Sequence, residues 1–220
     1  MSTIGERYQR LRAQLPSHVT LVAVSKYHAV SQIQEAYDAG CRDFGESREQ
    51  ELLDKAAQLP SDIHWHFIGH LQRNKVKKII PVVSLIHSVD TLSLWQKIDQ
   101  CAEEAGRAVD CLLQLHVAEE ETKFGFSISE LETLAGQSPW HRYTHARLSG
   151  LMAMATHTND EERVREDFLT ASNLFAQWQG LVGDPSFRIL SMGMSDDYPL
   201  ALEAHSTMVR IGSAIFGERT

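Results

Sequence analysis

Eight short apolar runs alternate with helical patterns along the whole chain, and this alternation limits the folds that the sequence can adopt. Strands that alternate with helices form a parallel sheet, and eight such pairs are the number that closes a (β/α)8 barrel. Runs of this length are typical of strands buried on both faces. The eight runs lie near Val19–Val24, Arg42–Gly45, His64–Ile68, Val82–His87, Cys111–Val117, Arg147–Met152, Phe187–Met192 and Met208–Ile211.

No linker rich in Pro, Gly or Ser and no low-complexity tract divides the 220 residues. We therefore expect an α/β fold with a single domain over residues 1–220, a (β/α)8 TIM barrel with an extra N-terminal helix at Ile4–Gln14. The chain is near the short end of that fold's usual size, so its loops must be brief. A doubly wound open sheet is the alternative, because periodicity alone does not exclude it.

Helix signals separate the apolar runs. A residue with a capping side chain precedes several of the periodic segments, and a cation, glycine or proline follows them. The expected helices are Gln32–Ala39 after Ser31, Leu71–Ile80, a helix from Asp90 or Thr91 to Ala105, and a long helix from Asp160 through Trp178 that ends at Gly180.

The composition argues against several classes of partner. A formal net charge of −8 disfavours nucleic acids and anionic membranes. No apolar stretch approaches the ~20 residues that span a bilayer, and the N-terminus lacks the apolar region of a secretory signal. The three cysteines show no metal-binding spacing and are expected to be free thiols. We expect a cytoplasmic protein without a nucleic-acid or membrane partner.

Lys26 closes the first apolar run and is the first candidate for chemistry. Open α/β and barrel folds build their active sites at the carboxyl ends of the strands. Partial burial at this position would lower the pKa of the amine and prepare it for Schiff-base chemistry. The alternative is an ordinary solvated lysine at the end of a strand.

Two small polar turns follow the last two runs. One contains Ser195 and opens a helix, and the other contains Gly212 and Ser213. In a barrel, turns at these two positions form the usual phosphate site, because a glycine lets the backbone approach the phosphate and the serines supply hydroxyl groups. The alternative is that both serines only cap helices.

Arg210 shares strand parity with Gly212, and barrel closure brings the last strand beside the first, which carries Lys26. A lysine, a phosphate site and an arginine on one rim favour a phosphorylated aldehyde cofactor. Pyridoxal 5'-phosphate fits best, because an Asp or Arg commonly contacts its ring nitrogen. The alternative for Arg210 is a salt bridge with a barrel carboxylate such as Glu46.

Two further groups are candidates for the same pocket. His64 and His66 share a strand face, but no third ligand is nearby, so we expect no metal and take His66 as a residue that lines the pocket. Four methionines lie at strand ends, where they fill gaps and can also line a slot for a ring: Met152, Met154, Met192 and Met194.

Several blocks of the sequence occur in the order known from one family. The chain resembles the pyridoxal phosphate homeostasis protein family over residues 19–217. One departure is Ser47, because family members often have an asparagine there, and a hydroxyl cannot reproduce both amide hydrogen bonds. The blocks are Ala23–Lys26, Phe44–Glu46, Trp65–Lys75, Gly150–Met154, Leu190–Asp197 and Val209–Gly217.

The resemblance implies a barrel related to the N-terminal domain of alanine racemase. It also implies pyridoxal phosphate held as an internal aldimine on Lys26, with Arg210 at the ring nitrogen. The implied role is to buffer or deliver the cofactor to apoenzymes that depend on it. The expected cofactor-binding residues are Lys26, Ser195, Arg210, Gly212, Ser213, Met194, His66, Met152 and Ser47.

Physical chemistry also favours a carrier over an enzyme. A guanidinium stays protonated, so Arg210 would keep the ring nitrogen unprotonated and make the ring a poor electron sink. Racemisation needs a base on each face of the ring, and the chain ends at Thr220 without room for the further domain that supplies one in the racemases. We therefore expect a monomer without catalytic activity.

Two alternatives remain. One is a weak amino-acid racemase or lyase that uses the cofactor on Lys26. The other is a cofactor-free Schiff-base aldolase, in which the phosphate site would hold a sugar phosphate.

Overall fold

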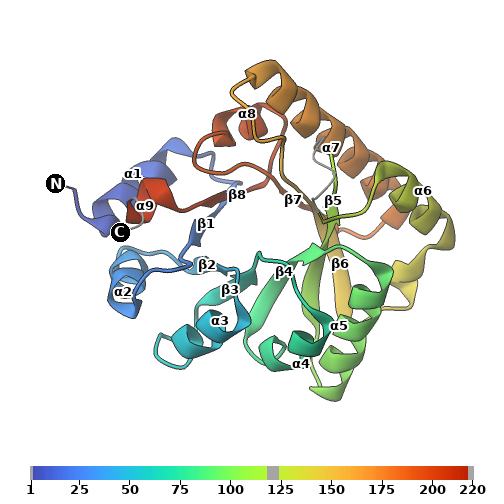
Figure 1. Cartoon of the computed structure of the whole chain (residues 1–220), viewed down its shortest axis with the longest axis horizontal. Coiled ribbons are helices and arrows are strands. Elements are labelled where there is room, and N and C mark those ends of the chain that lie inside the picture. Colours follow the sequence, from blue (N-terminus) through green and yellow to red (C-terminus); the bar gives the residue numbers. More distant parts are fainter. Residues whose placement is uncertain (1, 118–123, 218–220) are drawn as a thin grey trace.

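Strand β1 pairs with both β2 and β8, so the eight parallel strands close into a barrel in sequence order (Figure 1). The computed structural model describes residues 2–117 and 124–217. The closed sheet confirms the expected (β/α)8 barrel and excludes the open sheet. The strands are β1 Thr20–Val24, β2 Asp43–Glu46, β3 His64–Phe67, β4 Val83–Val89, β5 Val109–Leu115, β6 Ala146–Ala153, β7 Ile189–Ser191 and β8 Met208–Ile211.

Helices surround the barrel, and α1 lies beside α9 near the two ends of the chain (Figure 1). Helix α1 is the expected extra N-terminal helix, with a capping box between Thr3 and Glu6. No helix in the described ranges is both long and apolar enough to cross a membrane. The helices are α1 Ile4–Gln14, α2 Val30–Asp38, α3 Glu49–Ala56, η1 Arg73–Lys75, α4 Val76–Ile79, α5 Leu92–Glu104, α6 Ile128–Gln137, η2 Pro139–His141, α7 Glu161–Val182, α8 Tyr198–Glu203 and α9 Ser213–Phe216.

Three helix boundaries differ from the expectation. Helix α2 begins at Val30, so Ser31 lies inside it, and the side chain of Gln32 accepts a hydrogen bond from the backbone of Ala29 instead. The expected helix from Leu71 is a short 3₁₀ turn followed by α4.

The third difference is at the end of α7. This helix runs through Gly180 and ends at Gly183, whose φ of 64° gives the left-handed C-terminal stop. Gly180 has helical neighbours on both sides, and the apolar pattern of the buried Trp178 and Val182 continues past it. A glycine marks a helix end only where the apolar periodicity also stops.

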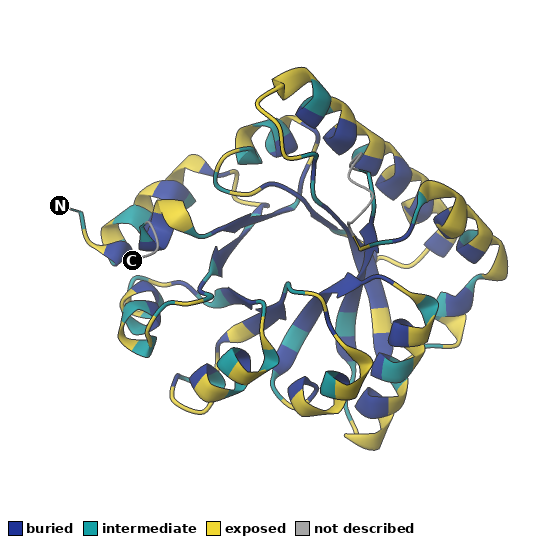
Figure 2. Ribbon diagram, in the orientation of Figure 1, coloured by how far each residue is buried: buried dark blue, intermediate teal, exposed yellow. Residues whose placement is uncertain are grey.

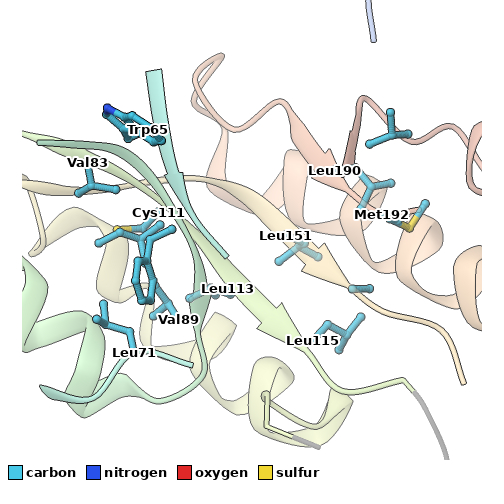
Figure 3. Close-up of a cluster of buried hydrophobic side chains, with 14 of the residues drawn as sticks. Trp65, Leu71, Val83, Val89, Cys111, Leu113, Leu115, Leu151, Leu190 and Met192 are labelled. Atoms are coloured by element: carbon cyan, nitrogen blue, oxygen red, sulfur yellow. The ribbon is translucent and has the colours of Figure 1, made fainter. Parts of the chain in front are cut away.

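Two apolar cores result from the alternation of side chains along the strands. The larger core lies between the barrel and the helices, and Figure 3 shows part of it, with Trp65, Val83, Leu113, Leu151 and Leu190 among its residues. Figure 2 shows the consequence, because the strands are buried while the helices expose their outer faces. The smaller core lies inside the barrel and consists of Val22, Leu85, Leu112, Met152 and Met208, with Met154 and Ile189 packed against it.

Candidate functional site

A cavity of about 550 Å³ lies at the carboxyl ends of the strands. Its wall is formed largely by inward-facing residues that come at or just after the end of a strand, as expected for an active site in a barrel. The lining residues are Val24, Lys26, His28, Ser47, Ile68, Gly69, Met154, Met194, Ser195, Asp196, Arg210, Gly212, Ser213 and Gly217.

Most of the residues expected from the sequence meet in this cavity. They come from four loops and from strand β8, which lie far apart in the sequence and meet because the barrel closes between β8 and β1. The expected residues that line the cavity are Lys26, Ser47, Met194, Ser195, Arg210, Gly212 and Ser213.

His66 and Met152 lie elsewhere. Both are expected to line the cavity, but the structure buries them inside the barrel. Strand β6 continues to Ala153, so Met152 belongs to the interior core and Met154, two residues later, lines the cavity. His66 is likewise buried inside the barrel, where it contacts His87 and Asp43.

Lys26 follows β1 and is held by the backbone on either side of it. Ser25 donates its hydroxyl hydrogen to Glu46, at 2.6 Å, and its carbonyl accepts a hydrogen bond from Lys55, at 2.8 Å. Tyr27 has a φ of 68°, in the left-handed region that a tyrosine rarely adopts. Its backbone N–H donates to Glu51. The chain therefore turns sharply at Lys26 and is fixed there by hydrogen bonds.

Glu46 is not the partner of Arg210. Its carboxylate is fully buried and accepts a hydrogen bond from the ammonium of Lys55 at 2.7 Å. Burial raises the pKa of Glu46, and the hydrogen bonds from Lys55 and Ser25 oppose this rise. The alternative of a salt bridge between Arg210 and Glu46 is therefore wrong.

Arg210 points into the cavity from β8 with a guanidinium whose partners are neutral. It donates from Nη1 to the carbonyl and the hydroxyl oxygens of Ser191, at 2.9 and 2.7 Å, and from Nη2 to the carbonyl oxygen of Ala153 at 3.2 Å. Burial lowers the pKa of Arg210 to about 10, while the charge of Asp197 opposes this effect. The guanidinium thus remains a cation at neutral pH, and two of its five N–H donors are left for a ligand.

The turn after β7 depends on Gly193. Its φ is 92°, and a Cβ atom there would lie 2.7 Å from the Cβ atom of Ala201. Ser195 does not cap helix α8, because the helix begins at Tyr198 and Asp197 occupies the capping position. The hydroxyl of Ser195 instead accepts a hydrogen bond from the backbone N–H of Gly212, at 3.4 Å. This bond joins the two turns into one wall of the cavity.

The turn after β8 supplies further donors. Ser213 is exposed and lines the cavity at the start of α9. Within the described part of the chain, the backbone N–H groups of Ser213 and Ala214 donate to no protein acceptor. A Cβ atom on Gly212 would lie 3.2 Å from the carbonyl oxygen of Val24, so the glycine allows β8 to approach β1 closely.

Several lining residues were not predicted from the sequence. His28 stacks on Phe216 with ring centroids 4.6 Å apart and adds a titratable ring to the cavity. Gly69 is required because a Cβ atom there would overlap the backbone of Ser47. Ile68 could have been found from strand parity, since it follows the inward-facing His66 by two positions. Met154 is one of the methionines that the sequence offered for a ring slot, and it lines the cavity.

The donor set suits a phosphorylated ring that carries an aldehyde. Hydroxyl and N–H donors gather at Ser195 and Ser213, Lys26 places an amine in the cavity wall, and Arg210 supplies a fixed cation. Val24, Ile68, Met154 and Met194 offer apolar surface for a ring. Across the described ranges, no three His, Cys, Asp or Glu side chains gather into a metal site.

Comparison with known proteins gives a family match over the whole chain. The model of the family described as alanine racemase, N-terminal domain, matches residues 1–220. A pyridoxal phosphate homeostasis protein from Synechocystis sp. is 39% identical over 217 residues, with 96% of this chain and 97% of the relative covered. A protein of the same name from Schizosaccharomyces pombe is 39% identical over 227 residues, with 100% and 94% covered.

Solved structures agree with the sequence comparison. PipY from Synechococcus elongatus is 37% identical, and the similarity covers 98% of this chain and 100% of that chain. The TM-score is 0.92 for PipY without PLP and 0.88 for PipY with PLP bound. The similarity therefore extends over the full barrel.

Proposed function

Because the chain belongs to the alanine racemase N-terminal domain family, and within it to the pyridoxal phosphate homeostasis proteins, we propose that it binds pyridoxal 5'-phosphate and buffers or delivers this cofactor. One observation carries the proposal. Lys26, Arg210 and the turns that contain Ser195 and Ser213 line a single cavity, although they come from opposite ends of the chain. We call these two turns the serine turns.

Each group has a distinct role in the proposed complex. The amine of Lys26 would hold the aldehyde carbon of the cofactor as a Schiff base. The hydroxyls of Ser195 and Ser213, with the N–H groups of the turn after Gly212, would bind the phosphate. Arg210 would donate to the ring nitrogen through its remaining N–H groups. His66 and Met152 have no direct contact with the cofactor in this proposal.

Apolar residues of the cavity would contact the pyridine ring of the cofactor. Met194 and Met154 would provide polarisable contacts to it. Ser47 also lines the cavity and offers one hydroxyl where related proteins often have an amide. We propose that this position contributes a weaker contact than an asparagine would.

We propose that the protein is a carrier and has no catalytic activity of its own. Bound pyridoxal phosphate acts as an electron sink when its ring nitrogen is protonated. Arg210 is donor-only, so it requires that nitrogen to accept a hydrogen bond and stay unprotonated. The relatives carry the name of homeostasis proteins, which supports the same role.

His28 is the residue that could contradict the carrier role. It lines the cavity and its ring can accept or release a proton. Its Nδ1 atom lies 3.3 Å from the side-chain oxygen of Gln32, and its ring is stacked on Phe216. We propose that these contacts fix the ring as part of the wall and that it does not serve as a base.

The remaining parts of the proposal concern the cellular setting. Cys41, Cys101 and Cys111 are free and buried, which suits a reducing compartment, so we propose a cytoplasmic location. We propose that the protein acts as a monomer and hands its cofactor to apoenzymes. The net charge of −8 supports partners other than nucleic acid or an anionic membrane.

A spectral titration and a transfer assay test the proposal. Purified protein is titrated with pyridoxal phosphate, and the absorbance of the bound chromophore is followed. We expect saturation at one equivalent, loss of the chromophore band in Lys26→Ala, and no loss in the control Lys78→Ala. Loaded protein should then restore activity to an apoenzyme of the same cofactor class. Failure to bind the cofactor would overturn the proposal.

A proton-exchange assay separates the carrier from the racemase alternative. L-amino acids are incubated with loaded protein in deuterated water, and α-proton exchange is measured for wild type, Lys26→Ala and His28→Ala. We expect no exchange at enzymatic rates of roughly 1–1000 per second. Rapid exchange that both substitutions abolish would establish a racemase or lyase. A colourless protein that forms a reducible adduct with a sugar phosphate would instead establish an aldolase.

A further inference from the structure

A continuous chain of hydrogen-bonded side chains crosses the inside of the barrel and ends at Arg210. Asp43 Oδ1 lies 3.1 Å from His66 Nε2, and His66 Nδ1 lies 2.9 Å from His87 Nε2. His87 Nδ1 lies 3.1 Å from the hydroxyl oxygen of Ser191, which lies 2.7 Å from Nη1 of Arg210. We call these five residues the interior chain.

The interior chain joins strands from both halves of the barrel. Asp43 begins β2 and has a side chain that is 30% exposed, whereas His66, His87, Ser191 and Arg210 are buried on β3, β4, β7 and β8. Burying a polar side chain costs folding free energy unless the side chain is hydrogen-bonded. We therefore ask whether one set of hydrogen bonds can satisfy all five residues of the interior chain.

The protonation states of Asp43 and His87 restrict the directions of the bonds in the interior chain. Burial acts to raise the pKa of Asp43, but the hydrogen bonds from His66 and His64 outweigh it and hold the pKa below its usual value. Burial lowers the pKa of His87 well below its usual value, and the charge of Arg210 adds to this effect. Asp43 is thus an anion that only accepts, and His87 is a neutral ring with one N–H.

One arrangement satisfies all five residues. His66 donates from Nε2 to Asp43, so the Nδ1 atom of a neutral His66 accepts from Nε2 of His87. The Nδ1 atom of His87 then accepts from the hydroxyl of Ser191. The same hydroxyl oxygen accepts from Nη1 of Arg210. Every donor points the same way, from the guanidinium towards Asp43, and bonds in such a series strengthen one another.

The reverse arrangement leaves a group unsatisfied. If Nδ1 of His87 carried the proton, it would donate to Ser191, and His66 would have to be protonated to donate to Nε2 of His87. The hydroxyl oxygen of Ser191 would then accept from both His87 and Arg210. Its own hydrogen would have no acceptor in the described part of the barrel. A buried unsatisfied donor is unfavourable, so the first arrangement is preferred at neutral pH.

We propose that Ser191, His87 and His66 are positioning residues, which fix the guanidinium of Arg210 in the orientation that contacts the ring nitrogen of a bound pyridine cofactor. This inference rests on the proposed function for the identity of the ligand. The chain holds Nη1 through the hydroxyl of Ser191, and backbone carbonyls hold Nη1 and Nη2. The remaining N–H groups of the guanidinium then stay available to the cavity that Arg210 lines.

The first test needs no ligand. Nitrogen-15 NMR of the histidine rings in the ligand-free protein at pH 7.5 reports which ring nitrogen carries the proton. We expect His87 as a fixed tautomer protonated at Nε2 and His66 as a neutral ring protonated at Nε2. A His87 ring that is protonated at Nδ1, or that exchanges rapidly between tautomers, would overturn the interior chain.

The second test separates positioning from a merely structural role. Dissociation constants are measured for pyridoxal phosphate and for its 1-deaza analogue, in which a carbon replaces the ring nitrogen. Ser191→Ala should weaken binding of pyridoxal phosphate by about tenfold, the effect of one hydrogen bond to a charged group. Binding of the deaza analogue should be nearly unchanged. Ser191→Thr keeps the hydroxyl and should restore the preference for pyridoxal phosphate.

The outcomes distinguish the two proposals. Equal weakening for both ligands in Ser191→Ala would contradict the positioning role and leave the proposed function intact. A wild-type protein that binds neither ligand would overturn the proposed function, and with it the role of the interior chain, whatever the NMR result. If Ser191→Ala does not fold, His87→Gln serves as the second variant, with the same expected difference between the two ligands.

Discussion

The ammonium of Lys55 donates a hydrogen bond to the backbone carbonyl of Ser25, 2.8 Å away and one residue before Lys26. The same ammonium contacts Glu46 and Glu51, each at 2.7 Å. Since Glu51 also accepts the backbone N–H of Tyr27, one buried ion cluster holds the residues on both sides of Lys26.

Removing the cation of this cluster should destabilise the protein strongly. Lys55→Met leaves the carboxylate of Glu46 without its counter-ion. Water cannot replace the counter-ion, because the side chains of Lys55 and Glu46 are only 6% and 0% exposed. We expect the free energy of unfolding to fall by about 3–5 kcal/mol in urea denaturation. The control Lys78→Met, at an exposed position 3.8 Å from Glu49, should change it by less than about 0.5 kcal/mol. Equal free energies of unfolding for the two variants would show that the ion cluster does not stabilise the fold.

The stability of the fold should depend on pH through His87. Burial lowers the pKa of His87 well below the usual 6.5, so the folded protein keeps this ring neutral while the unfolded chain protonates it below about pH 6.5. The unfolded state then binds more protons. The contribution to the free energy of unfolding therefore falls as the pH drops below 6.5, by up to about 1.4 kcal/mol per pH unit.

His87→Gln isolates this contribution. Urea denaturation at pH 7.5 and 5.5 should show a smaller loss of stability for the variant than for wild type, because glutamine does not titrate. The exposed His64 provides the control, and His64→Gln should keep the wild-type loss. An unchanged pH dependence in His87→Gln would contradict this account, because it would mean that the ring has the same pKa in the folded and the unfolded protein.

Two glycines should respond in opposite ways to substitution by alanine. Gly193 has a φ of 92°, and a Cβ atom there would lie 2.9 Å from the Cα atom of Tyr198, so Gly193→Ala should destabilise the turn and weaken cofactor binding. Gly180 lies inside α7, with nothing within 4 Å of an added Cβ atom. Gly180→Ala should raise the free energy of unfolding by about 0.5–1 kcal/mol. Thermal unfolding of both variants tests the pair, and a stabilised Gly193→Ala would contradict the geometry.

The two serine turns should recognise the phosphate and not the ring. Replacement of Ser195 and Ser213 by alanine removes two hydroxyl donors. We expect the dissociation constant for pyridoxal phosphate to rise about 10–100-fold, since hydrogen bonds to a charged group contribute about 1.5–3 kcal/mol. Binding of pyridoxal, which lacks the phosphate, should change little. A parallel loss for both ligands would place the phosphate elsewhere.

The sequence predicted the barrel and most residues of its site, but not how far along each strand a side chain must lie to reach the cavity. The sequence predicts that His66 and Met152 line the cavity, whereas both are buried inside the barrel. Their distance from the cavity depends on where β3 and β6 end, which apolar runs do not define to better than a few residues. Ile68 and Met154, each one inward step later, line the cavity instead.

Tertiary contacts explain the other differences. The ion pair between Glu46 and Lys55 joins a strand and a helix that the sequence alone did not associate. The interior chain joins Asp43 to Arg210 across five strands, and no spacing in the sequence brings its members together. Such contacts follow from the closure of the barrel and become visible only in three dimensions.

Reduction of the loaded protein with borohydride, followed by peptide mass mapping, tests the central claim most directly. Borohydride converts a Schiff base into a stable pyridoxyl-lysine, so the modified residue is identified by its mass. We predict that the pyridoxyl group lies on the peptide that contains Lys26 and that Lys26→Ala abolishes the modification. Labelling chiefly at Lys55, Lys75 or Lys77, or equal labelling of wild type and Lys26→Ala, would contradict the account.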